Sequence, residues 1–238
     1  MLFAIAAALA GTGARTTTLE TGAGTVTFFA AGHGTVRVDA PGTTVWIDPW
    51  SETDLSGPKA DLVLVTDVHF DHLDAAAAAQ VAGPKAVFVA PKSVADQLER
   101  KVDHVLANGE KAEVAGIGIE AVPMYNLVRG PEEGKRFHDK GRGNGYILTI
   151  GGKRVYFAGD TECTDEMKAL KGIDLAFVPM NLPYTMPPDE AAACVAAFAP
   201  AVAVPYHYRG SDLSVFTAAL KGTSVKVQEL EFYAGGEK

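Results

Sequence analysis

The chain has 238 residues, a length that fits one large domain or two small ones. Hydrophobic residues make up 47% and charged residues 21%, which is typical of a globular protein with a sizeable core and excludes disorder outside the ends. The formal net charge of −8 argues against nucleic acid as a partner, because such binding requires a basic surface.

Residues 1–14 are similar to a degenerate secretory signal segment. Residues 2–10 are nearly all apolar, and Ala8, Leu9 and Ala10 resemble a small-residue cleavage site, although the expected basic residues are missing before them. The stretch is much shorter than the roughly 20 apolar residues of a membrane-spanning helix, so we expect no membrane partner. The sequence predicts an exported protein, periplasmic or secreted, that loses this segment, or else a cytoplasmic protein with a frayed first segment.

From residue 25 onward, the pattern predicts short strands first, and then strands that alternate with helices. Strand-like runs occur at 26–30, 35–39, 44–48, 62–65, 86–90, 117–122, 146–150, 154–158, 175–179 and 201–205. Helical patterns occur at 75–82, 93–100, 164–170, 188–198 and 211–220, with Ser93 as a predicted cap. No linker rich in proline or serine interrupts this order, so we expect one layered α/β domain over residues 25–238.

The two cysteines, Cys163 and Cys194, lie 31 positions apart, and neither has a second cysteine close by. Two thiols are too few to predict a disulfide framework. We therefore expect two small, buried, apolar side chains.

The segment TDVHFDH at residues 66–72 follows the apolar run 61–65 directly and carries four ligand-type side chains: Asp67, His69, Asp71 and His72. Imidazole and carboxylate groups suit zinc, iron or manganese, and a short turn can direct several of them toward one point. The cluster therefore predicts a metal site where a buried strand ends.

The same arrangement occurs at two more strand ends. Asp160 follows the run 155–158 through Gly159, and His207 follows the run 202–205. Loops at such strand ends are where α/β proteins commonly assemble their sites. Although an Asp after Gly can simply form a turn, the repetition at three strand ends favours one shared site.

At these residues the chain resembles the metallo-β-lactamase superfamily. Residues 66–72 are similar to its HxHxDH signature with Asp67 in place of the first His, and Gly159, Asp160 and His207 match the later motifs in the right order. The run Ile47-Asp48-Pro49-Trp50 resembles the branch that includes the ascorbate-phosphate lactonases. The resemblance implies a four-layer αβ/βα sandwich with one or two divalent metals at its edge.

Carried over residue by residue, the resemblance implies two metal positions. Asp67, His69 and a third His would hold one ion; Asp71, His72 and His207 would hold the other, with Asp160 bridging both. Between the motifs the chain offers only His104 and His138 as the third His. We choose His138, which precedes a glycine-rich turn, although it could contact substrate instead; His104 sits beside a predicted helix end and is interpreted as structural.

The substitution at Asp67 bears on the metal. A carboxylate in place of imidazole adds negative charge and favours harder ions. Zinc is our first expectation, with manganese or iron as alternatives. The same change could weaken binding enough to leave a single ion, and the sequence alone does not decide between one and two.

The resemblance implies a hydrolase in which the metal lowers the pKa of a bound water. Asp71 is the predicted catalytic residue that orients this water or takes its proton, and His33 and Asp48 are predicted to hold the ligands in place. Cations surround His138, and Arg209 follows His207 by two positions, so we expect a small anionic ester, lactone or phosphodiester as substrate. Arg142, Arg209 and Asn126 are the residues predicted to bind it.

Two alternatives stay open. One is a nuclease of the same superfamily, which the acidic composition disfavours. The other is a non-catalytic metal-binding module that kept the fold and lost turnover, a possibility raised by Asp67. Assembly into a homo-oligomer is also left open by the sequence.

Overall fold

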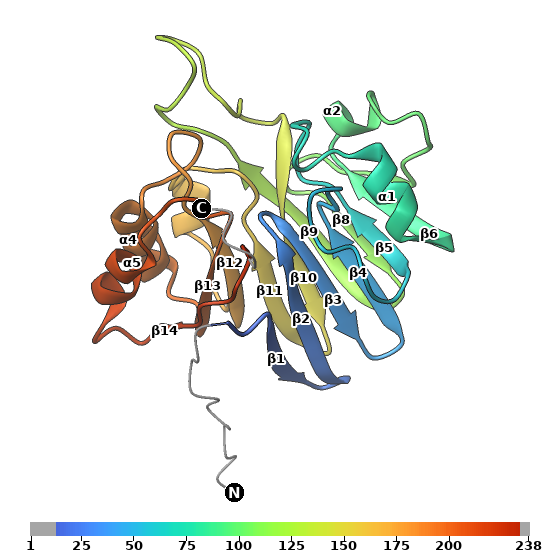
Figure 1. Ribbon diagram of the computed structural model, residues 1–238, viewed down its shortest axis with the longest axis horizontal. Coiled ribbons are helices and arrows are strands. Elements are labelled where there is room, and N and C mark those ends of the chain that lie inside the picture. Colours follow the sequence, from blue (N-terminus) through green and yellow to red (C-terminus); the bar gives the residue numbers. More distant parts are fainter. Residues whose placement is uncertain (1–12, 234–238) are drawn as a thin grey trace, which may run out of the picture.

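The computed structural model describes residues 13–233, so the predicted signal core at residues 2–10 lies outside the described residues. Two seven-stranded sheets pack face to face, and helices cover the outer face of each (Figure 1). The predicted four-layer αβ/βα sandwich is confirmed. Among the described helices, none is long and apolar enough to span a membrane.

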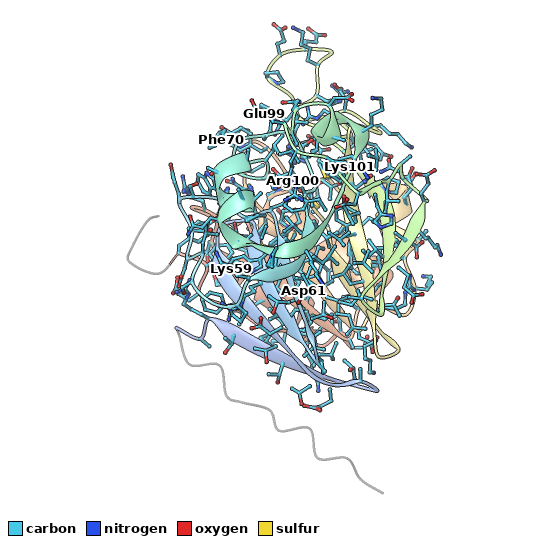
Figure 2. The ribbon with its side chains drawn as sticks, turned by 90° about the vertical axis from the view of Figure 1, so that its right-hand side faces the viewer. Lys59, Asp61, Phe70, Glu99, Arg100 and Lys101 are labelled. Atoms are coloured by element: carbon cyan, nitrogen blue, oxygen red, sulfur yellow. A yellow bond between two sulfur atoms is a disulfide. The ribbon has the colours of Figure 1, made fainter. Side chains whose placement is uncertain are left out.

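The first sheet contains the strands of the N-terminal half in chain order. They are β1 (Thr16–Thr21), β2 (Gly24–Gly32), β3 (Thr35–Ala40), β4 (Thr43–Ile47), β5 (Ala60–Leu64), β6 (Ala82–Ala90) and β7 (His104–Val105). The pairs from β1 to β4 are antiparallel and those from β4 to β7 are parallel. Figure 2 shows Asp61 of β5 and Phe70 of the following loop at opposite ends of this layer, so β5 leads the chain toward the 66–72 segment.

The second sheet repeats this plan with the rest of the chain. Its strands are β8 (Lys111–Val114), β9 (Ile117–Met124), β10 (Gly143–Ile150), β11 (Lys153–Phe157), β12 (Leu175–Pro179), β13 (Val202–Tyr206) and β14 (Lys226–Val227). The pairs from β8 to β11 are antiparallel and those from β11 to β14 are parallel. Each half of the chain therefore ends in parallel strands whose last residues can share a site.

Apolar side chains fill three layers. Between the sheets, the rings of Phe28 and Phe177 lie 5.8 Å apart, and those of Phe157 and Phe177 are stacked at 4.8 Å. The first sheet's outer face is covered by α1 (Ala75–Val81) and α2 (Lys92–Ala95). The second sheet's outer face is covered by α3 (Asp165–Lys168), α4 (Pro188–Phe198) and α5 (Leu213–Leu220).

The helix predicted at 93–100 is much shorter in the structure. The α2 helix ends at Ala95, and Ser93 does not cap it: its Oγ donates to the backbone carbonyl of Arg142, 2.6 Å away. After α2 the chain turns back to the sheet and lays the guanidinium of Arg100 over the ring of Phe88, 3.5 Å from its centroid. These contacts with other elements, which a local pattern cannot show, end the helix early.

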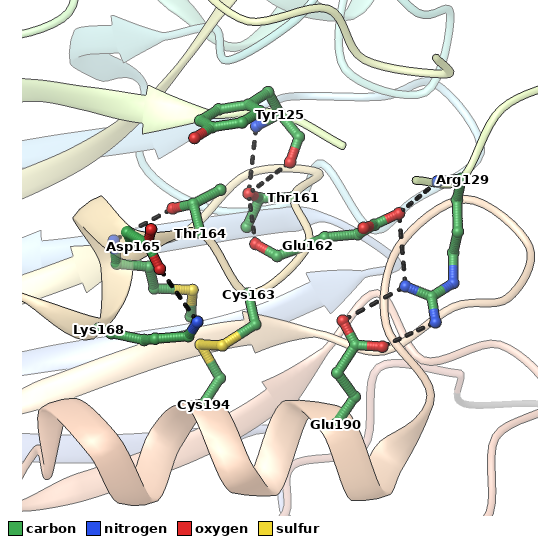
Figure 3. The surroundings of a disulfide bond; sticks show 11 residues. Tyr125, Arg129, Thr161, Glu162, Cys163, Thr164, Asp165, Lys168, Glu190 and Cys194 are labelled. Atoms are coloured by element: carbon green, nitrogen blue, oxygen red, sulfur yellow. Dashed lines mark hydrogen bonds and ion pairs between the residues drawn. A yellow bond between two sulfur atoms is a disulfide. The ribbon is translucent and has the colours of Figure 1, made fainter. Parts of the chain in front are cut away.

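The interpretation of the cysteines was wrong. Cys163 and Cys194 form a disulfide, with their Cα atoms 5.6 Å apart. It joins the loop after β11 to α4, as Figure 3 shows. The two cysteines come together because α4 packs on the second sheet. Since they are 31 residues apart in the sequence, no local pattern predicts that they are close in space.

Candidate metal centre

Residues that follow the parallel strands converge at one edge of the sandwich. Asp48 follows β4, the segment 66–72 follows β5, Asp160 follows β11 and His207 follows β13. The carboxyl ends of parallel strands meet at the same edge of a sheet. The site therefore takes side chains from both sheets.

The first group of ligand-type residues, which we call the His72 site, consists of His72, Asp160 and His207. One ligand atom of each lies within 4.8 Å of the others. The Nε2 atoms of His72 and His207 are each 3.5 Å from an oxygen of Asp160. Asp71 borders the group, with its Oδ2 3.4 Å from Nε2 of His207.

Unpaired polar atoms mark the His72 site. Within residues 13–233, the Nε2 atoms of His72, His207 and His138 and the Oδ1 of Asp160 are buried without a hydrogen-bond partner. An unpaired buried polar group costs about 1–3 kcal/mol, so most such groups in proteins are paired. A divalent cation would satisfy nitrogen and carboxylate acceptors together, and the residues present therefore fit a metal ion.

The second group, the Asp67 site, consists of Asp67, His69 and His138. The Oδ2 of Asp67 lies 3.1 Å from Nδ1 of His69 and 4.0 Å from Nε2 of His138. His138 adjoins the His72 site as well, since its Nε2 is 3.4 Å from Oδ2 of Asp160. The structure thus brings six of the seven predicted metal ligands into two adjoining groups, and the seventh, Asp71, borders the His72 site. His104 lies in β7, outside both.

Arg142 occupies the edge of the Asp67 site. Its Nε and Nη2 atoms donate to the two oxygens of Asp67 at 2.9 and 2.7 Å, and Nη2 also lies 3.3 Å from Nε2 of His69. This bidentate geometry is the strongest that Arg and a carboxylate can form.

Asp48 and Thr66 fix the orientation of His72. The Oδ2 of Asp48 lies 2.7 Å from Nδ1 of His72, and Asp48 also accepts hydrogen bonds from the backbone N–H and hydroxyl of Thr66. A carboxylate on Nδ1 keeps the proton there and leaves Nε2 free to bind a metal.

Asn126 fixes His138 in the same way. Its Oδ1 lies 2.6 Å from Nδ1 of His138 and accepts from that residue's backbone N–H, while its Nδ2 donates to Glu162 and to the Tyr184 carbonyl. The amide is buried and fully engaged within the protein. Asn126 therefore positions His138, which differs from the predicted contact with substrate.

A match to a family model decides the family. The model described as the β-lactamase superfamily domain matches residues 25–207. This range contains every residue of both sites. The chain belongs to the β-lactamase superfamily.

Individual relatives show which group within the β-lactamase superfamily the chain belongs to. A UPF0173 metal-dependent hydrolase from Koribacter versatilis is 32% identical over 192 residues, covering 74% of this chain and 82% of that protein. The chain therefore belongs among the UPF0173 metal-dependent hydrolases.

Solved structures agree with this placement. A crystal structure from Parabacteroides distasonis, assigned to the metal-dependent hydrolases, is similar with a TM-score of 0.85 and 37% identity, covering 91% of this chain and 98% of that one. Igni18, a metallo hydrolase from Ignicoccus hospitalis, is similar with a TM-score of 0.70 and 26% identity, covering 86% and 94%.

The centre of this superfamily member is rich in negative charge. Burial raises the pKa of Asp160, but His207 and His72 outweigh it and hold that pKa well below its usual range. Burial lowers the pKa of His72, but Asp160, Asp48 and Asp71 outweigh it and raise that pKa well above its usual range. Both directions indicate a demand for positive charge, which a metal ion would meet.

His33 connects Asp71 to the far side of the site. Its Nε2 lies 3.1 Å from Oδ2 of Asp71 and its Nδ1 lies 2.7 Å from the Tyr233 hydroxyl. Burial and the nearby His207 lower the pKa of His33 to about 4, so the imidazole is neutral at pH 7. A neutral His33 donates one N–H to Asp71 and accepts from Tyr233.

The basic loop around His138 is mostly neutralised. Lys135 pairs with Glu132 at 2.5 Å, Lys140 pairs with Glu166 at 2.6 Å, and Arg142 pairs with Asp67. The predicted role of Arg142 in substrate binding stays a prediction, and its guanidinium is committed to Asp67 in this structure.

Arg209, by contrast, has no carboxylate partner among residues 13–233. It lines a pocket beside the metal centre together with Arg15, Ala31, Gly32, His33, Trp50, Glu52, Thr53, Asp54, Phe232 and Tyr233. Arg15 in the same pocket already pairs with Asp54 at 2.8 Å. Arg209 is therefore the pocket's uncommitted cation.

Glu162 and Tyr233 were not predicted as residues of the site. Glu162 accepts hydrogen bonds from the backbone N–H groups of residues 127, 128 and 129, at 2.7 to 3.1 Å, and so holds the loop that carries His138. Its place two residues after Asp160 was a usable signal. Tyr233 gave no signal, because nothing near it in the sequence indicates a site.

Proposed function

We propose that this chain hydrolyses small anionic esters, lactones or phosphodiesters with a metal-activated water. The observation that carries the proposal is the set of unpaired, buried ligand atoms of the His72 site. Two imidazoles with a carboxylate are a common ligand set of catalytic zinc, which leaves a coordination position for water. Zinc is therefore the proposed metal, with manganese or iron as alternatives that the carboxylates would tolerate.

A divalent ion bound there would supply a water of lowered pKa and a positive charge beside the reacting oxygen. Asp71 is the residue that we propose acts on that water. Its Oδ2 faces Nε2 of His207 at 3.4 Å and is held by His33, while its side chain keeps 15% of its surface exposed. A partly accessible carboxylate in this position can orient a water and accept its proton.

Arg209 supports an anionic substrate. Its guanidinium lines the pocket next to His33 and is not neutralised by any described carboxylate, so it can receive a phosphate or carboxylate group. The chain's overall acidity makes a local cation at this place more informative than one on a basic surface.

The test is turnover with zinc, manganese or iron added to metal-stripped protein. Suitable substrates are a p-nitrophenyl ester, lactones with and without a phosphate group, and bis(p-nitrophenyl) phosphate. We expect His207→Ala to lower kcat/KM by at least about 100-fold, since it removes a metal ligand. Arg209→Met should raise KM about 10-fold for anionic substrates alone, the loss of one ion pair.

The matched control is Arg136→Met. Arg136 lies on the loop that carries His138, yet among residues 13–233 it donates only to the backbone carbonyls of Leu127 and Lys135. Its kinetics should equal those of the wild type. Metal bound at the site without turnover of any substrate would favour a non-catalytic module and overturn the proposal.

A further inference from the structure

The Asp67 site differs from the His72 site in what its ligand atoms already contact. Both oxygens of Asp67 accept from Arg142, at 2.9 and 2.7 Å, and the second oxygen also lies 3.1 Å from Nδ1 of His69. The acceptor capacity that a metal would use is therefore largely taken by a permanent cation of the chain itself.

Arg142 also affects the form of His69. A guanidinium cannot lose its protons in a protein, so Nη2 of Arg142, 3.3 Å from Nε2 of His69, faces that nitrogen as a donor. Nε2 is then the acceptor, and the proton of the neutral ring sits on Nδ1. Yet Nδ1 is the nitrogen directed toward Asp67 and the site, so it presents N–H where a metal needs a lone pair.

The His72 site has the opposite character. Asp48 on Nδ1 of His72 turns Nε2 toward Asp160, and three ligand atoms of the His72 site have no hydrogen-bond partner in the part of the chain that the structure describes. At the Asp67 site, only Nε2 of His138 is buried without a hydrogen-bond partner among the described residues. A single imidazole is too few for a divalent ion, which usually takes three protein ligands even in a catalytic site.

The backbone holds Arg142 in this place. Its carbonyl accepts from the Ser93 hydroxyl at 2.6 Å, its N–H donates to the Asp139 carbonyl at 3.1 Å, and β10 begins at the next residue. The side chain is only 23% exposed. Arg142 is thus anchored on both sides, unlike a mobile surface arginine.

We infer that Arg142 occupies the Asp67 site in place of a metal ion, so that this chain binds one divalent ion, at the His72 site. Arg142 supplies one of the two positive charges that a divalent ion would bring, and Asp67 is the carboxylate that pairs with it. This inference rests on the metal binding of the proposed function but not on the substrate.

The test is the number of metal ions per chain, measured by elemental analysis and by calorimetric titration with zinc. We expect one equivalent in the wild type and one in His69→Ala, because His69 does not hold the ion, but none in His207→Ala. Arg142→Met, which removes the cation and keeps a long side chain, should raise the number to two, and adding His69→Ala to it should return the number to one.

The control is again Arg136→Met, which should stay at one equivalent. Two equivalents in the wild type, falling to one in His69→Ala, would overturn the inference, as would an Arg142→Met protein that folds and still binds one. No metal in any variant would overturn the proposed function together with the inference, whereas two in the wild type would overturn the inference alone.

A second readout does not depend on any substitution. Nitrogen-15 NMR of the histidine rings assigns the proton to Nδ1 or Nε2. We expect His69 in the zinc-loaded wild type to keep its proton on Nδ1 and to show no metal-induced shift there. A zinc-bound, unprotonated Nδ1 on His69 would overturn the inference.

Discussion

Three residues of the site have a strained backbone conformation. Asp48, His33 and His207 have φ angles of 45°, 47° and 47°, in the left-handed region that non-glycine residues rarely adopt. Each such conformation costs about 1–2 kcal/mol, so the surrounding contacts must outweigh it. Here His33 and His207 are tied together, because the N–H of His207 donates to the carbonyl of His33 at 3.0 Å. The left-handed backbone conformation directs these side chains toward one point.

Tyr156 offers a test of the second sheet's outer layer. Its hydroxyl is buried without a partner in the described part of the chain. Tyr156→Phe should therefore stabilise the protein by about 1 kcal/mol in urea unfolding. Tyr208→Phe is the matched control, since the Tyr208 hydroxyl donates to Leu230 at 3.0 Å and its removal should cost about 1 kcal/mol.

The advantage of Tyr156→Phe should grow at alkaline pH. Burial raises the pKa of Tyr156, so the folded chain keeps the proton while the unfolded chain loses it near pH 10. The contribution of Tyr156 to the free energy of unfolding of the wild type is therefore fully present below about pH 10 and is lost as the pH rises further. A gain that stays constant from pH 8 to pH 11 would contradict this account.

Replacing Glu162 should be costly, because this residue holds the loop that carries His138. Glu162→Gln removes one acceptor oxygen from a carboxylate that binds three backbone N–H groups, and we expect a loss of about 1.5–3 kcal/mol in the free energy of unfolding. Glu166→Gln is the control: its pair with Lys140 is solvent-exposed, so its loss should be clearly smaller than that of Glu162→Gln. Equal losses in the two variants would argue against a structural role for Glu162.

At the residue scale, the sequence predicted which candidate ligand side chains lie close together, because strand ends carry them. Asp160 and His207 each follow an apolar run, and parallel strands bring such positions together. The contact of Arg142 with Asp67 spans 75 positions and depends on the path of a loop, so no local pattern reveals it. Asn126 was assigned to substrate for the same reason: its partner His138 is 12 positions away.

At the element scale, the disulfide links the metal centre to the helical layer. Cys163 lies three residues after Asp160 on the same loop, and Cys194 lies within α4 (Figure 3). Arg129 makes a second link from the loop that carries His138, pairing with Glu162 and with Glu190 of α4. The α4 helix therefore supports two of the loops that surround the site.

Replacing both cysteines tests the first link. In Cys163→Ala with Cys194→Ala, the free energy of unfolding should fall by about 2–4 kcal/mol, because the closed loop of about 31 residues no longer restrains the unfolded chain. Dithiothreitol should lower the stability of the wild type but not that of the double variant. An equal response of both proteins to the reductant would contradict the pairing.

Strand prediction failed mainly at the edges of the sheets. The sequence did not predict β1, β7, β8 or β14, which are the edge strands of the two sheets. The residues of β1, TTTLET, carry little apolar signal, because an edge strand needs only one partner and few buried side chains. The interior strands were all predicted, because each contains apolar residues that pack into the core.

At the scale of the whole molecule, the metal site joins the two sheets. His72 comes from the loop after β5 in the first sheet, whereas Asp160 and His207 follow strands of the second. An ion held by these three residues would fasten the two halves of the sandwich at one edge. Metal binding should therefore be coupled to global stability.

Metal removal tests this coupling. A ligand that binds only the folded state, at about 1,000 times its Kd, stabilises it by about 4 kcal/mol. For a chain of this size, each kcal/mol shifts Tm by about 2–4 °C, so chelation should lower Tm by roughly 8–16 °C. His207→Ala should melt at the same temperature with and without metal. If the chelator leaves the Tm of the wild type unchanged, the site contributes nothing to holding the two sheets together.

The central claim is that His72, Asp160 and His207 hold a divalent metal. The most direct measurement is an anomalous difference map from crystals of the zinc-loaded protein, collected on both sides of the zinc absorption edge. The account predicts a peak within about 2.0–2.2 Å of His72 Nε2, His207 Nε2 and an Asp160 oxygen, and none between Asp67 and His69. A map without a peak at these three residues would contradict it.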